Sequence, residues 1–165
     1  MNKRKQLTLF ITEKHAETIE DIRGKYNPAQ YALIKAHVTL CREDEIENIS
    51  TIIESLESLS HKSIIINFDK IVGFSNGKGV LISATKINTE YHELREEILK
   101  NANAKIKFHE PHITLMHPRN STCTDEIFEK IKKCSFPFAL SFEKISLIEQ
   151  ILGQPWKILS EYYLS

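Results

Sequence analysis

Apolar residues follow two different spacings along this chain, and the spacing changes several times from one end to the other. Recurrence every three or four positions predicts amphipathic helices, whereas β-branched and aromatic residues gathered between turn residues predict strands. The expected helices cover residues 13–25, 44–59, 89–102 and 125–134. The expected strands cover residues 6–11, 36–41, 63–74, 80–87, 111–116, 136–148 and 156–164.

Turn and cap residues mark where these elements end. Thr12 and Thr124 precede two of the helices as candidate N-caps, and an Asn-Pro pair at residues 27–28 interrupts the chain after the first helix. Residues 75–79 and 152–155 contain the glycines expected in hairpin turns. Hairpin strands separated by helices predict an α+β fold with a largely antiparallel sheet, rather than a doubly wound parallel one.

Two of the expected short strands carry nearly the same sequence. Residues 36–40 read Ala-His-Val-Thr-Leu and residues 111–115 read Pro-His-Ile-Thr-Leu, and an amphipathic helix is expected after each. Chance alone predicts such a pair on the order of a few times in a thousand chains of this composition. Because alternate side chains share one face of a strand, each strand is expected to bury its aliphatic positions and to present a histidine beside a threonine.

This duplicated pattern suits acid–base chemistry at a phosphate. If the two halves of the chain are related by a pseudo-twofold axis, His37 and His112 face each other across a cleft. One neutral histidine can then remove a proton from the attacking oxygen while the other, protonated, gives a proton to the leaving oxygen. The hydroxyls of Thr39 and Thr114 can hold the non-bridging oxygens. Histidine titrates near pH 7, so no extreme pKa is required.

The paired His–apolar–Thr–apolar motifs resemble those of the 2H phosphoesterase superfamily, which includes 2′-5′ RNA ligase-like proteins and cyclic nucleotide phosphodiesterases. The resemblance extends over nearly the whole chain, including residues 71–74 and the final hairpin. It implies one domain over residues 1–165, with motifs at 37–40 and 112–115. That domain is expected to be bilobal α+β, a pseudo-twofold pair of largely antiparallel sheets with outer helices around a central groove. Ala36 departs from the proline that many relatives have before the first histidine.

The resemblance also implies an activity and a set of site residues. Members of the family act without a metal or other cofactor on 2′,3′-cyclic phosphates or 2′-5′ phosphodiesters of RNA or nucleotides. By that resemblance His37 and His112 are the catalytic pair, and Thr39 and Thr114 bind phosphate. The expected substrate is therefore an RNA end or a small nucleotide. The alternative is a non-catalytic module of the same fold that binds an RNA end or a nucleotide without turning it over.

A few further residues are candidates for contact with the substrate. His117 and Arg119 follow the second motif, where relatives often place a substrate-contacting residue, and the guanidinium fork of arginine suits phosphate. Phe10 lies on the first strand, where some relatives place an aromatic residue near the ligand. Cys41 shares the predicted face of the first motif and is expected at the rim of the groove as a bystander. The basic run at residues 3–5 is expected to be a solvated chain end.

Composition limits the other classes of function. The chain has 165 residues, and 22 Lys and Arg balance 22 Asp and Glu, which argues against a broad nucleic-acid-coating surface but not against a pocket for one phosphate. Threonine is a poor zinc ligand and neither motif contains a carboxylate, so a metal site is not favoured. Three cysteines without a CxxC pair, and no signal or membrane segment, predict a cytoplasmic monomer with reduced thiols and no obligate protein partner.

Overall fold

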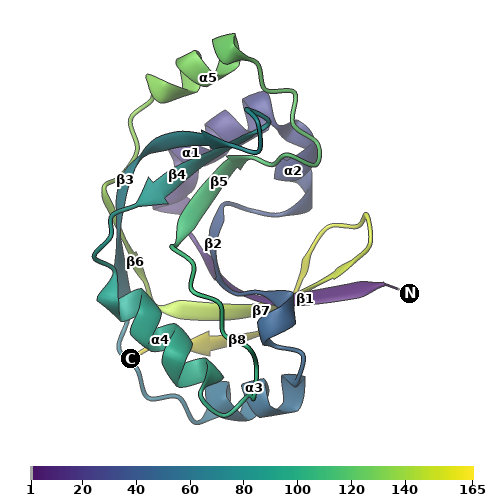
Figure 1. The fold of residues 1–165 in the computed structure, drawn as a ribbon, viewed down its shortest axis with the longest axis vertical. Coiled ribbons are helices and arrows are strands. Elements are labelled where there is room, and N and C mark those ends of the chain that lie inside the picture. The colour runs from purple at the N-terminus through teal and green to yellow at the C-terminus, as the bar shows by residue number, and fades with distance from the viewer. Residues whose placement is uncertain (1) are drawn as a thin grey trace.

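The strands of the computed structural model, which describes residues 2–165, form one curled antiparallel sheet (Figure 1). Within those residues there are eight strands: β1 (Lys3–Phe10), β2 (His37–Cys41), β3 (Ile64–Phe74), β4 (Gly79–Ala84), β5 (His112–Met116), β6 (Ala139–Phe142), β7 (Lys144–Ile151) and β8 (Lys157–Tyr163). The same residues form five α-helices: α1 (Glu13–Tyr26), α2 (Pro28–Leu33), α3 (Ile49–Glu57), α4 (Thr89–Leu99) and α5 (Asp125–Lys132). A short 3₁₀ helix, η1 (Glu43–Glu45), follows β2.

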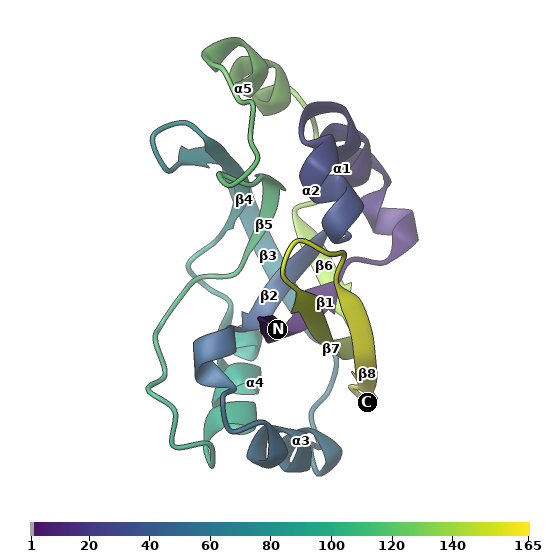
Figure 2. The ribbon, with the colours of Figure 1, turned by 90° about the vertical axis from the view of Figure 1, so that its right-hand side faces the viewer.

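The sheet consists of two similar halves that meet at the motif strands. Its strand order is β6-β3-β4-β5-β2-β1-β7-β8, so β5 and β2 are the central neighbours. They pair antiparallel with Val38 opposite Ile113, and Figure 2 shows them side by side in the middle of the molecule. The predicted α+β, pseudo-twofold architecture is confirmed, with the refinement that the two sheets are joined into one.

The helices cross between the halves. α1 follows β1 but packs against β5 of the other half, and α4 follows β4 and packs against β2 of the other half as well as against β3 of its own. In Figure 1, α1, α2 and α5 gather at one end of the molecule, whereas α3 and α4 lie at the other. Ile19 of α1 and Leu94 of α4 are fully buried, as expected for the apolar stripes of amphipathic helices. Each motif strand is therefore supported by a helix from the opposite half.

One helix was not predicted, and two predictions about the elements were wrong. The Asn-Pro pair at residues 27–28 ends α1 at Tyr26, as predicted, but Pro28 begins the further helix α2, because its fixed φ suits the first turn of a helix. The helix expected from residue 44 begins only at Ile49, since Glu43–Glu45 turn as η1. The strand expected over 136–148 is two strands, β6 paired with β3 and β7 paired with β1.

The two predicted N-caps differ in what they do. The hydroxyl of Thr124 accepts a hydrogen bond from the backbone N–H of Ile127 at 3.2 Å, so it caps α5. Thr12 occupies the same position before α1 but makes no such bond, and its hydroxyl lies 3.1 Å from Nδ1 of His15. No helix formed by residues 2–165 is both long and apolar enough to cross a membrane.

Candidate active site

The two motif strands expose the same kind of face, as the alternation predicted. Val38 and Leu40 in β2, like Ile113 and Leu115 in β5, are at most 1% exposed. The intervening histidines and threonines are half-buried on the opposite face. Because the strands pair antiparallel about Val38 and Ile113, the two faces are brought together, and the first histidine–threonine pair runs opposite to the second.

These four side chains line one cavity of about 260 Å³. The rest of the lining is dominated by basic and imidazole side chains, and among the described residues no Asp or Glu contributes to it. The other residues around the cavity are Arg4, Gln6, Arg23, Gln30, Ile34, Arg42, His109, His117, Arg119 and Trp156. A pocket of this composition favours an anionic ligand over a cationic one.

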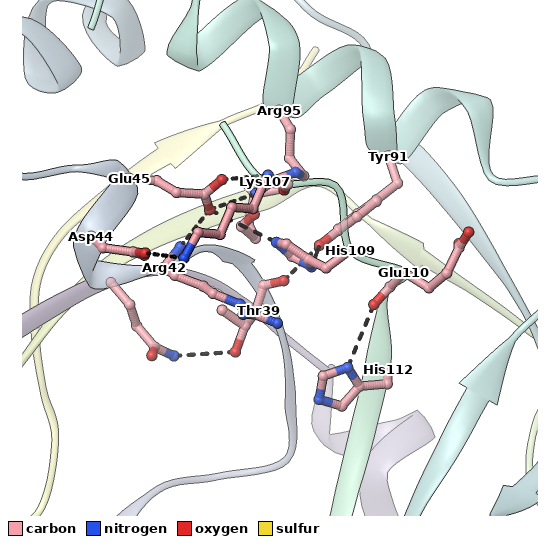
Figure 3. A network of polar contacts seen from close by, with 12 residues as sticks. Thr39, Arg42, Asp44, Glu45, Tyr91, Arg95, Lys107, His109, Glu110 and His112 are labelled. Atoms are coloured by element: carbon pink, nitrogen blue, oxygen red, sulfur yellow. Dashed lines mark hydrogen bonds and ion pairs between the residues drawn. The ribbon is translucent and has the colours of Figure 1, made fainter. Parts of the chain in front are cut away.

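The backbone orients both histidines in the same way. Nδ1 of His37 lies 2.8 Å from the carbonyl oxygen of Lys35. Nδ1 of His112 lies 3.5 Å from the carbonyl oxygen of Glu110 (Figure 3). A carbonyl oxygen only accepts hydrogen bonds, so Nδ1 carries the proton in the neutral ring and Nε2 is left free for proton exchange. In each case the carbonyl belongs to the residue two positions before the histidine.

Burial keeps both imidazoles neutral at pH 7 in the unliganded protein. Burial lowers the pKa of His37 to about 4, and the positive charge of Arg23 acts in the same direction. The pKa of His112 is also lowered, mainly by burial and further by His109 and Arg42. An anion between the two rings would favour their protonated forms, because opposite charge stabilises the imidazolium.

Thr39 is fixed by groups from two other elements. The side-chain amide of Gln6 in β1 lies 3.5 Å from the Thr39 hydroxyl and donates to the hydroxyl of Thr8 at 2.8 Å. The hydroxyl of Tyr91 in α4 donates to the Thr39 carbonyl oxygen at 2.8 Å. The backbone at the first motif is therefore tied to the helix that packs on β2.

A buried ion pair extends this connection (Figure 3). The guanidinium of Arg95 contacts the carboxylate of Glu45 through two hydrogen bonds of 2.9 and 2.6 Å, and it also donates to the Leu40 carbonyl oxygen at 2.5 Å. Burial alone raises the pKa of Glu45, but the nearby His109, whose Nε2 lies 3.8 Å away, and hydrogen bonds from Arg95 and the Arg42 backbone together hold that pKa well below its ordinary range. The pair joins β2, η1 and α4 directly behind the cavity.

The additional candidates lie in different places. His117 and Arg119 both line the cavity, and the backbone N–H of Arg119 donates to Nδ1 of His117 at 3.1 Å. Phe10 is outside the lining; its ring meets that of His37 edge-on, with 6.1 Å between the centroids. Cys41 is fully buried instead of reaching the rim, and burial raises its pKa to about 12. The predicted alternation fails there because the β1–β2 register shifts beside its partner Leu7.

The sequence reasoning missed several residues of the site. Arg4 is not part of a solvated end: β1 begins at Lys3, and Arg4 lines the cavity together with Gln6. Alternation along β1 was the signal that could have placed both on one face. His109 and Trp156 also line the cavity, but no local pattern singled them out. Within residues 2–165, no three His, Cys, Asp or Glu side chains gather in a way that could hold a metal ion.

Comparison with known proteins places the chain in a family. The sequence pattern of the 2′-5′ RNA ligase superfamily matches residues 11–154, and the protein belongs to this superfamily. No curated protein sequence matches it.

Solved structures share the fold at low sequence identity. E. coli LigT in complex with phosphate is 17% identical over 99% of this chain and 98% of its own, with a TM-score of 0.69. LigT in its apo form is 15% identical over 100% and 99%, with a TM-score of 0.71. A protein described as a phosphoesterase is 14% identical over 99% of each chain, with a TM-score of 0.72. The protein therefore has the LigT-like fold.

Proposed function

We propose that this protein is a metal-independent phosphoesterase that acts on a 2′,3′-cyclic phosphate or a 2′-5′ phosphodiester of RNA or a nucleotide. The observation that carries the proposal is the pairing of β2 with β5. It brings two histidines and two threonines, from motifs 75 residues apart, into one cavity without a carboxylate in its described lining. Membership of the 2′-5′ RNA ligase superfamily supports a phosphoester substrate.

His37 acts as the general base in this proposal. Its low pKa leaves Nε2 unprotonated at neutral pH, and the carbonyl of Lys35 fixes the ring. Nε2 takes a proton from the attacking water as the water oxygen bonds to phosphorus. Neutral His37 is thus already in the state that the first half of the reaction requires.

His112 acts as the general acid. The anionic phosphate favours its protonated form, and its Nε2 gives a proton to the ribose oxygen as the bond from phosphorus to that oxygen breaks. The hydroxyls of Thr39 and Thr114 donate to the non-bridging oxygens and stabilise the charge that develops there. The products are a phosphomonoester and a free hydroxyl, and proton exchange with solvent restores the two histidines.

The relatives and the remaining contacts support a nucleotide in this groove. LigT, which shares the fold, is known in complex with phosphate and with 3′-AMP. Phe10, beside the His37 ring, is positioned to contact a substrate at the edge of the site. We further propose that the protein works as a cytoplasmic monomer, in keeping with its three free thiols.

Single histidine variants test the proposal. His37→Ala and His112→Ala are each expected to lower kcat by about 10²–10⁴ on a 2′,3′-cyclic nucleotide, because each removes one proton-transfer group. His15→Ala, an exposed histidine on α1, is the matched control and should keep the wild-type rate. Saturable binding with no turnover of any cyclic or 2′-5′-linked substrate would instead favour a non-catalytic binding module.

The roles of the two histidines are separable by the leaving group. A nitrophenyl phosphodiester has a leaving group that needs no proton, so the His112→Ala variant should recover much of its rate on that ester. The His37→Ala variant should remain slow on both substrates. Recovery by His37→Ala alone would reverse the assignment, and near-wild-type turnover of a cyclic nucleotide by the double variant would exclude the mechanism.

A further inference from the structure

The chain reaches the second motif through a segment that is neither helix nor strand. Residues 100–111 connect α4 to β5, and those from 103 to 110 are exposed except Ala104 and His109. The side chain of His109 is 10% exposed and lines the motif cavity, three positions before His112. The proposed proton transfers use His112 but not this buried neighbour.

The ring of His109 is held between α4 and η1 (Figure 3). The Tyr91 hydroxyl uses its proton in the bond to the Thr39 carbonyl oxygen, so its own oxygen, 3.4 Å away, accepts from Nδ1 of His109. On the other side of the ring, Nε2 lies 3.8 Å from the Glu45 carboxylate and has no hydrogen-bond partner within residues 2–165. Tyr91 therefore contacts both the backbone of the first motif and the segment before the second.

Two other side chains of α4 contact the same segment. Arg95 donates to the Lys107 carbonyl oxygen at 3.0 Å. His92 stacks on the Phe108 ring, with 4.7 Å between the centroids, and its Nε2 lies 3.6 Å from the Glu110 carboxylate. Both partners of His92 are exposed, Phe108 by 75% and the Glu110 side chain by 43%. The buried imidazole that bonds to Tyr91 is thus the best-protected anchor of the segment.

The anchored segment contains the carbonyl that orients His112. Glu110 comes directly after His109, and its carbonyl oxygen lies 3.5 Å from Nδ1 of His112. Only Pro111 separates Glu110 from His112, and it is buried, with a fixed φ and no N–H. The position of the orienting carbonyl therefore depends on what holds the chain just before it.

The chain before the first motif is held in a comparable way by different groups. Lys35, whose carbonyl orients His37, lies between two anchored residues. Arg23 donates to the carbonyl oxygen of the residue before Lys35, at 2.7 Å, and Glu20 accepts from the N–H of the residue after it, at 3.1 Å. Before the second histidine a proline fills the latter position and has no N–H to donate. The orienting carbonyl of the second motif is therefore fixed only from the side of the buried imidazole.

We propose that His109 is a positioning residue for the general acid: it holds the Glu110 carbonyl against Nδ1 of His112, so that Nε2 presents its proton to the ribose oxygen. The proposal rests on the proposed phosphoesterase function and adds a residue to it. A carbonyl oxygen beside Nδ1 fixes both the rotation of the ring and the nitrogen that carries the proton when the ring is neutral. A misaligned acid slows the chemical step while the substrate still binds, so His109 acts on kcat and not on KM.

Replacement of His109 by leucine tests the proposal on two esters. On a 2′,3′-cyclic nucleotide, His109→Leu should lower kcat about 10- to 100-fold and change KM less than about threefold, because the acid is misaligned in an intact cavity. On a nitrophenyl phosphodiester, whose leaving group needs no proton, kcat should fall less than about threefold. Equal losses on both esters, or a raised KM with unchanged kcat, would overturn the positioning role.

Two further variants separate positioning from packing. His109→Asn places an amide N–H near the position of Nδ1, so it keeps a donor to Tyr91 and should recover most of the wild-type kcat. Lys107→Gln is the matched control, since it breaks an exposed ion pair with Asp44, 3.7 Å apart, that joins the same segment to η1, and it should keep the wild-type kcat. An asparagine variant as slow as the leucine variant would contradict the role of the Nδ1 donor.

The tautomer of His112 is measurable without turnover, so a failure of positioning is distinguishable from a failure of the phosphoesterase function. In NMR spectra of the side-chain nitrogens at about pH 8, wild-type His112 should carry its proton on Nδ1, as the Glu110 carbonyl requires. His109→Leu should move a large fraction of that proton to Nε2, and Lys107→Gln should leave it in place.

Tyr91→Phe removes a single oxygen atom and replaces the leucine variant if that protein does not fold. It should move the His112 proton toward Nε2 as well, because His109 loses its acceptor. An unchanged His112 tautomer in the folded variants would refute the positioning role even in an active enzyme. The expected tautomers without turnover of any phosphoester would count against the proposed function alone.

Discussion

The buried pair between Arg95 and Glu45 allows a quantitative prediction for Glu45→Gln. The side chains are 4% and 1% exposed, and the Glu45 carboxylate also accepts from the Arg42 backbone N–H at 3.0 Å. Glutamine keeps the shape, but it turns an amide donor toward a guanidinium donor and leaves a buried positive charge unpaired. Breaking a buried ion pair in this way costs about 3–5 kcal/mol. For a domain of this length each kcal/mol lowers Tm by about 2–4 °C, so the expected decrease is about 6–20 °C.

Thermal unfolding followed by circular dichroism at pH 7 measures this effect. The control is Glu126→Gln, which breaks an exposed pair with Lys130 on α5, 3.3 Å apart, and should change Tm by less than about 2 °C. A lowered carboxyl pKa stabilises the fold above the ordinary glutamate pKa, and this stabilisation disappears as pH falls through the folded-state pKa. The difference in Tm between the wild-type protein and Glu45→Gln should therefore become smaller at acid pH. A decrease in Tm of less than about 3 °C at pH 7 would refute the reasoning.

Three further outcomes are expected. The plot of kcat/KM against pH should be bell-shaped. Its rising limb should lie near pH 4, where His37 loses its proton, and the midpoint of its falling limb should lie below the ordinary histidine pKa of 6.5, where His112 loses its own. A value of kcat/KM that still rises above neutral pH would contradict this. Thr124→Ala should cost about 1 kcal/mol in thermal or urea unfolding, and Thr12→Ala clearly less, since only Thr124 caps its helix; equal losses would contradict this. Turnover should survive EDTA, whereas activity lost on chelation and restored by zinc would favour a metal mechanism.

The motif residues could be predicted because their placement is decided locally. A strand alternates its side chains whatever it pairs with, so residues 37–40 and 112–115 were assigned to the correct faces. The pseudo-twofold relation followed from the repetition of the motif. The sequence therefore identified the side chains at the centre of the cavity.

The residues around that centre depend on distant partners. Arg4 lies opposite Gln150, which is 146 positions away in the chain. No residue near Arg4 in the sequence indicates that the pairing of β1 with β7 continues as far as Lys3. The helix expected from residue 44 is displaced because Glu45 is drawn into the pair with Arg95, an interaction that the apolar periodicity does not contain. Long-range pairing thus decided the positions that local pattern could not.

The two halves of the sheet differ in how the chain builds them. β3, β4, β5 and β6 follow one another along the chain, whereas the half that contains β1 and β2 is completed by β7 and β8 near the C-terminus. α1 and α4 each contact the motif strand of the other half. A fragment ending before β7 would leave the edge of β1 open to pairing with other molecules. Because neither lobe can close its own core, the chain should fold and unfold as a single cooperative unit, and the two histidines should be brought together only when the last hairpin has been added.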